Sequence, residues 1–149
     1  MNALFNPSRD EARDFFFEVW RKYLGNEILT AMESMAAAVI GEHPEYHEML
    51  NDKRRYLEKF RERDYPPEFG ETNPFLHLGM HIAIREQLSI DQPAGVREHH
   101  QALCTKCGSA HEAEHQMMDC LAEMIWQSQR NQGAPDAGIY LACLVRKRI

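Results

Sequence analysis

The chain has 149 residues, of which 44% are hydrophobic and 27% are charged, and its formal net charge is -6. A chain of this size and composition buries a core, which excludes a disordered or fibrous protein. Nucleic acid is not an expected partner, because the positive residues of this acidic chain form no basic face for phosphates.

The start of the chain, MNALFNPSRDEARDFFF, has neither the basic nor the apolar segment of an export signal. No segment approaches the ~20 apolar residues that cross a bilayer, so we expect a cytoplasmic protein without a membrane partner. Cysteines stay reduced in that compartment. No disulfide is therefore expected, and Cys120 and Cys143 are interpreted as core fillers.

Helix signals recur along the whole chain, and no segment alternates with the period of a strand, which predicts an all-α fold. Capping boxes mark helix starts, as in Thr30 with Glu33 and Ser109 with Glu112. The third helix is expected to break near Asn51. In chain order the predicted helices cover residues 8–25, 30–41, 44–60, 73–89, 96–107, 110–131 and 139–145.

The helix over residues 73–89 has apolar side chains around its whole circumference, which is typical of a buried helix. Residues 61–72 form the clearest loop. It separates two helical halves, each too small to bury a good core alone. We therefore predict one domain, residues 1–149, built as a bundle of about six to seven helices around the central helix 73–89.

Histidines occur in three H-x-x-x-H pairs, in the segments HPEYH, HLGMH and HEAEH. Residues four apart lie one above the other on a helix, so both imidazoles of a pair can bind one ion. A single inward histidine is usually a core residue with a hydrogen-bond partner, whereas this clustering makes a metal site an equal alternative. The predicted ligands of one transition-metal ion, zinc, nickel or iron, are His77, His81, His111 and His115.

Other residues are expected to support that site. His43 and His47 are weaker candidates, because Pro44 makes His43 a helix cap that need not align with His47. A charged group on a buried helix needs a partner or a cavity, so Arg85 is expected either to pair with a carboxylate, which is the favoured interpretation, or to support the site. The expected supporting residues are Arg85, Glu86 and Glu114. No nucleotide cofactor is expected.

Two further motifs carry alternatives. HEAEH fits the H-E-x-x-H pattern of zinc peptidases with Glu112 as the base, but it opens a helix and no strand lies near it. A capping Glu112 is the favoured interpretation. Cys104 and Cys107 form a C-x-x-C motif that could bind zinc with His111 or His115, act as a redox pair, or consist of inert thiols.

The runs GETNPFLHLGMHIAIREQLSIDQP and HEAEHQMMDCLAEMIWQSQR, together with FNPSRDEARDFFFEVWRKY and HPEYH, resemble a family of small bacterial proteins classed as a domain of unknown function. The likeness covers nearly the whole chain and implies a stand-alone bacterial protein. In the family pattern the histidine pairs are present and the C-x-x-C motif is not. A looser likeness to hemerythrin-like and DinB-like bundles, which bind metals through histidines on facing helices, is an analogy only.

The leading hypothesis is therefore a helical bundle that binds one transition metal through paired histidines. A non-enzymatic interaction module with structural core histidines is the first alternative, and an H-E-x-x-H metallohydrolase is the second. The sequence identifies no surface for a protein partner or for a second copy of the chain.

Overall fold

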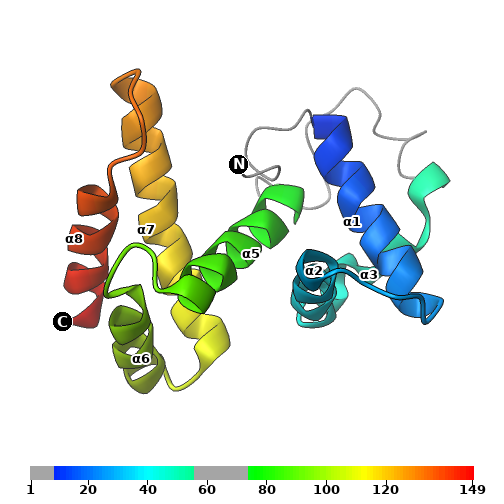
Figure 1. The fold of residues 1–149 in the computed structure, drawn as a ribbon, viewed down its shortest axis with the longest axis horizontal. Helices are drawn as coiled ribbons and strands as arrows, with labels where there is room; N and C mark the ends of the chain where they lie inside the picture. Colours follow the sequence, from blue (N-terminus) through cyan, green and yellow to red (C-terminus); the bar gives the residue numbers. More distant parts are fainter. Residues whose placement is uncertain (1–8, 56–73) are drawn as a thin grey trace. The chain divides into compact units, whose positions relative to one another are not determined.

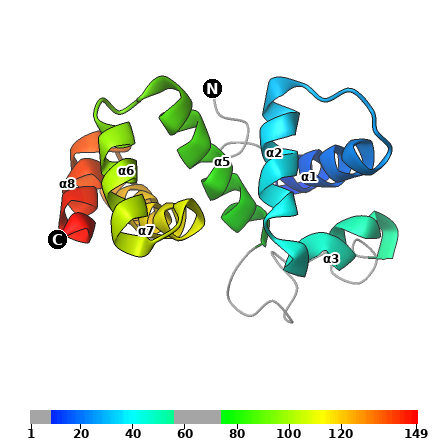
Figure 2. The ribbon, with the colours of Figure 1, turned by 90° about the horizontal axis from the view of Figure 1, so that it is seen from below.

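The computed structural model describes residues 9–55 and 74–149, and in these two ranges all regular structure is helical (Figures 1 and 2). The predicted all-α class is confirmed. No helix in these ranges is both long and apolar enough to cross a membrane. The elements are α1 (Arg9–Leu24), α2 (Ala31–Gly41), the 3-10 helix η1 (Pro44–Tyr46), α3 (His47–Asn51), α5 (Pro74–Ile90), α6 (Val96–Cys107), α7 (Ala110–Arg130) and α8 (Ala137–Arg148).

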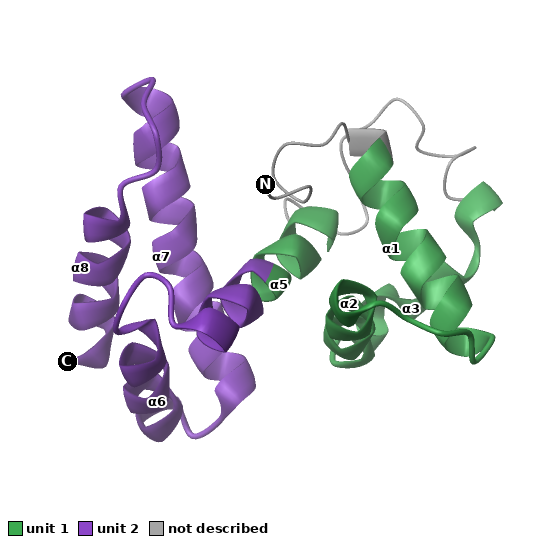
Figure 3. Cartoon of the chain, viewed as in Figure 1, with its two compact units in different colours: residues 1–82 green, residues 83–149 purple. Residues whose placement is uncertain are grey.

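The chain divides into two compact units, residues 1–82 and residues 83–149 (Figure 3). The division falls within α5, so the first half of that helix belongs to unit 1 and the second half to unit 2.

The core of unit 1 is formed by α1, α2, η1, α3 and the first half of α5. Phe75 joins α5 to α1, because its ring centroid lies 6.1 Å from that of Phe16 and 5.9 Å from that of Phe17. Burying each such ring stabilises the fold by about 1.5–3 kcal/mol. Tyr23, which follows Val19 by four residues on α1, is nevertheless 51% exposed and stacks against Trp20.

Local capping signals in unit 1 are confirmed. The Thr30 hydroxyl accepts the backbone N–H of Glu33 at 3.1 Å, and the Glu33 carboxylate accepts the Thr30 N–H at 2.9 Å. Asp52 leaves the helical conformation, which gives the predicted interruption after α3. The predicted cap at Ser8 and the end of the third helix near residue 60 lie outside the described residues.

In unit 2, α6, α7 and α8 pack against one another (Figures 1 and 2). The second half of α5 joins them through polar contacts. Arg85 Nε lies 3.2 Å from Glu114 Oε1 on α7, and Tyr140 Oη on α8 donates to Gln87 Oε1 at 2.6 Å. Burial raises the pKa of the Tyr140 phenol, so the phenol keeps the proton that it donates.

The long helix α7 is buried over only part of its length. Met117, Met118 and Leu121 are buried, whereas Trp126 is 53% exposed. Arg130 covers the Trp126 ring at 5.2 Å from its centroid. A cation over the indole face explains how this large side chain lies at the surface.

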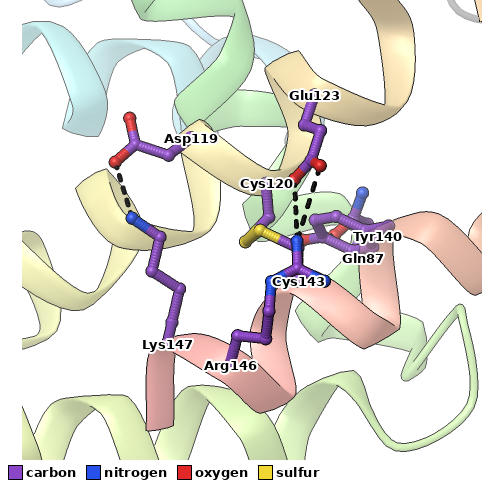
Figure 4. The surroundings of a disulfide bond; sticks show 8 residues. All are labelled: Gln87, Asp119, Cys120, Glu123, Tyr140, Cys143, Arg146 and Lys147. Atoms are coloured by element: carbon purple, nitrogen blue, oxygen red, sulfur yellow. Dashed lines mark hydrogen bonds and ion pairs between the residues drawn. A yellow bond between two sulfur atoms is a disulfide. The ribbon is translucent and has the colours of Figure 1, made fainter. Parts of the chain in front are cut away.

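A disulfide joins α7 to α8 and corrects the expectation of reduced thiols (Figure 4). Cys120 and Cys143 are both buried, and their Cα atoms are 5.5 Å apart, inside the range that a disulfide spans. Ion pairs between the same helices, Lys147 with Asp119 and Arg146 with Glu123, flank the bond. The prediction failed because it rested on an assumed compartment and not on the packing of these helices.

The disulfide predicts a thiol count. Unfolded, unreduced protein should show two thiols that react with Ellman's reagent, Cys104 and Cys107, and four after reduction. Closing a loop of this length stabilises a fold by about 3 kcal/mol. The Cys120→Ala, Cys143→Ala variant should lose about that much unfolding free energy and become insensitive to dithiothreitol. Four reactive thiols before reduction would contradict the bond.

The capping box at α2 predicts a smaller effect. Thr30→Ala should lower the free energy of unfolding by about 1 kcal/mol, because it removes the acceptor of the Glu33 N–H. Thr105→Ala is a matched control, since the Thr105 hydroxyl donates to a carbonyl within α6 and caps no helix. Urea unfolding of both variants measures the difference, and equal losses would show that the cap contributes nothing specific.

Candidate metal centre

The position of His43 follows from the end of α2. The helix ends at Gly41, and Pro44 then starts η1, so the chain turns at His43. The His43 Nδ1 atom lies 2.7 Å from the carbonyl oxygen of Val39. A carbonyl only accepts, so Nδ1 carries the proton and the Nε2 atom of the neutral ring carries a lone pair. The buried His43 ring is thereby held with Nε2 available as a ligand atom.

Two histidines of α5 meet this ring inside unit 1. His77 Nε2 lies 3.2 Å from His43 Nε2 and 3.3 Å from His81 Nε2. The three ring centroids are 4.7 to 5.0 Å apart, so the rings form a compact triangle. His43 and His81 are buried and His77 is partly buried. The three imidazoles come from two segments of the chain, and each ring contributes its Nε2 atom to the contacts of the cluster.

The spacing of these nitrogens matches a coordination shell. Tetrahedral zinc with Zn–N bonds of about 2.0–2.1 Å requires ligand nitrogens about 3.3–3.4 Å apart. The two Nε2 contacts of His77 are 3.2 and 3.3 Å. The cluster is thus close to the arrangement that an ion would need.

Tyr46 forms one wall of the cluster. Its ring stacks on His43 with centroids 5.8 Å apart and meets His77 edge-on at 6.3 Å. Burial, and to a smaller extent the neighbouring Glu45 carboxylate, raises the pKa of the Tyr46 phenol. The wall is therefore an uncharged aromatic surface at neutral pH.

His47 is directed elsewhere. Its Nε2 atom lies 2.8 Å from the carbonyl oxygen of Ile40, and its ring packs 4.5 Å from that of Trp20. The HPEYH pair is therefore divided, with only His43 in the cluster. Sequence reasoning ranked His43 and His47 as weaker candidates because Pro44 need not let them align, and the two rings do lie apart. It did not predict that His43 meets His77 and His81.

Unit 2 carries the second predicted pair. The rings of His111 and His115 are 4.4 Å apart near the start of α7, so the two imidazoles are neighbours as expected. Ser109 accepts the Glu112 N–H, but the Glu112 carboxylate lies 3.7 Å from His115 Nδ1. Glu112 is exposed in the first turn of the helix. The cap is real, and the carboxylate approaches a histidine in addition.

The acidic residues expected to support the site are all in unit 2. Glu114 is buried and paired with Arg85, which satisfies both charges. Glu86 has one buried carboxylate oxygen, Oε1, that has no hydrogen-bond partner among the described residues. His43 and His81 in unit 1, and His111 and His115 in unit 2, are histidines that could hold a metal ion.

The C-x-x-C motif lies at the end of α6, and both of its thiols are free and partly buried. Cys104 Sγ contacts the ring of His100, 3.5 Å from Nε2. Sequence reasoning missed His100, although its spacing of four residues from Cys104 is the same helical signal that revealed the histidine pairs.

Comparison with known proteins identifies the family. No curated protein and no solved structure matches the chain. The family described as "Domain of unknown function (DUF1841)" matches residues 8–146, which is nearly the whole chain. The protein therefore belongs to this family of unknown function.

Proposed function

We propose that the protein binds one transition-metal ion through imidazole nitrogens, with His43, His77 and His81 as the ligands that unit 1 supplies. The observation that carries the proposal is the approach of His77 Nε2 to two other Nε2 atoms at 3.2 and 3.3 Å. Neutral imidazole is a good ligand for zinc, nickel and iron.

The proton count of the cluster supports the proposal. His43 Nε2 is an acceptor, because its Nδ1 donates to Val39. His77 Nε2 is either a donor or an acceptor, so it cannot donate to His43 and also accept a proton from His81 Nε2. A bound cation would take one lone pair from each of the three nitrogens and would require no proton between them.

The hydrogen bond from His43 to Val39 adds to this. Metal-binding histidines commonly donate their other ring N–H to a carbonyl, which fixes the tautomer and the direction of the ring. His43 has this arrangement on a rigid helix end. One ligand is therefore oriented before any ion arrives.

The sequence predicts His111 and His115 as metal ligands as well, and for this pair of unit 2 the prediction rests on the sequence alone. Arg85 and Glu114 would not bind the ion themselves. Their ion pair would support the first turns of α7. An ion with three or four nitrogen ligands and an open position would lower the pKa of a bound water and so provide a hydroxide for hydrolysis.

The metallohydrolase alternative needs Glu112 as a base beside such a water. Its carboxylate is exposed and lies 3.7 Å from His115 Nδ1, a place that suits capping and histidine orientation. No observation favours peptidase chemistry over simple metal binding. The interaction-module alternative requires the protein to carry no metal, which the following experiment decides.

Metal binding predicts a stoichiometry. Metal-free, full-length Cys104→Ser, Cys107→Ser protein, which lacks the free thiols of α6, should bind one equivalent of Zn²⁺, measured by calorimetry. Free zinc at 100 times Kd should stabilise it by about 2.7 kcal/mol against unfolding, and the histidine variants are compared in this same background. His77→Gln and His43→Gln should each weaken zinc binding by about 100-fold. This is at the upper end of the loss caused by removing a hydrogen-bond partner of a ligand, because here the ligand itself is removed. His47→Gln is the matched control and should leave the affinity unchanged. Zinc affinities that are equal in all four proteins would refute the cluster as the site.

The contribution of unit 2 predicts a separate result. The His111→Gln, His115→Gln variant should still bind one equivalent of Zn²⁺, because the unit 1 cluster is intact, and its affinity tests whether the sequence-predicted pair takes part. Glu112→Gln should bind zinc like the unchanged protein. An unaltered affinity in the double variant would restrict the site to unit 1.

A further inference from the structure

A second set of ligand atoms lies on α6, within unit 2. His100, Cys104 and Cys107 are spaced by four and three residues, which places them on one face of the helix. All three side chains are partly buried, and both thiols are free. The set is separate from the histidine cluster of unit 1 and involves none of its residues.

We propose that His100, Cys104 and Cys107 form a second metal site, for a thiophilic d10 ion such as Zn²⁺ or Cd²⁺. Zinc held by one thiolate at about 2.3 Å and one imidazole at about 2.0–2.1 Å sets sulfur and nitrogen about 3.5 Å apart. Cys104 Sγ lies 3.5 Å from His100 Nε2. Cys104 Sγ also lies 3.8 Å from His100 Nδ1, so the ring presents both nitrogens to the sulfur. A rotation of this partly exposed ring would direct Nε2 at the shared ion.

The electrostatics at this helix end favour a cation over a reactive thiolate. Both thiols lie in the last turn of α6, which ends at Cys107, and Gly108 follows in the left-handed conformation with φ of 82°. The partial negative charge of a helix C-terminus attracts cations. Catalytic thiols occupy the opposite end of a helix, where the dipole stabilises the thiolate.

The surroundings of Cys104 agree with this. Burial first, and then the nearby Cys107 and Glu114, raise the pKa of the Cys104 thiol. Metal binding would release the thiol proton, as it does whenever a thiol becomes a ligand. His100 and Cys104 are in contact, and the proposed site requires the Cys107 side chain, which lies three residues further on, to rotate toward the same ion. Solvent would then complete a tetrahedral shell.

The experiment uses Co²⁺ as the probe, because only thiolate ligands give it an intense charge-transfer band in the near ultraviolet. Co²⁺ is titrated into metal-free, full-length protein in which Cys104 and Cys107 are reduced. The band should grow until the thiolate site is saturated with Co²⁺. The band should be absent in the Cys104→Ser, Cys107→Ser variant, and His100→Gln should shift the titration midpoint by about 10-fold or more. Far-ultraviolet circular dichroism confirms that each variant is folded.

The controls separate this site from the proposed function. His77→Gln should keep the band, since imidazoles give no such transition, and Gln101→Ala should keep it because this exposed residue lies on another face of α6. The Cys120→Ala, Cys143→Ala variant should keep it as well. Absence of the band in the unchanged protein, or its survival in the Cys104→Ser, Cys107→Ser variant, would overturn the second site without affecting the unit 1 cluster.

Discussion

The close approach of three imidazole nitrogens inside an apolar core is the constraint on which the account of unit 1 depends. His43 and His81 are buried beside large apolar side chains, and His77 links them through Nε2. Buried polar groups must be satisfied, and a neutral imidazole offers one donor and one acceptor. Because Val39 accepts the N–H of His43 Nδ1, the Nε2 atom of that ring keeps its lone pair. A cation is the simplest occupant that suits such a group of nitrogens.

Unit 2 is held together differently. A buried disulfide and two ion pairs fasten α7 to α8, and the pairs of Arg85 with Glu114 and Tyr140 with Gln87 fasten α5 to them. Of these contacts, the Arg85–Glu114 pair lies near the start of α7, where the second histidine pair also lies. Rigid support of this kind is what a ligand set requires, since loosely held imidazoles lose affinity to conformational entropy. The α6 thiols lie on the partly exposed side of the same unit.

The sequence predicted what depends on local chemistry. The Thr30 box, the glycine after α6 and the burial of α5 follow from periodicity and capping, and the structure has them. It could not predict the Cys120–Cys143 bond, because that pairing depends on how α7 and α8 pack. His43 was underrated for a related reason: a short 3-10 turn decides which ring of HPEYH faces His77. Such turns leave little trace in residue patterns.

The most direct test of the metal centre is X-ray absorption at the zinc edge, on Cys104→Ser, Cys107→Ser protein loaded with one equivalent of Zn²⁺. We predict only nitrogen or oxygen neighbours at about 2.0–2.1 Å, with the scattering pattern of at least three imidazole rings. Adding His43→Gln should remove one ring from that pattern. A shell dominated by oxygen, or a spectrum that His43→Gln does not change, would contradict the account.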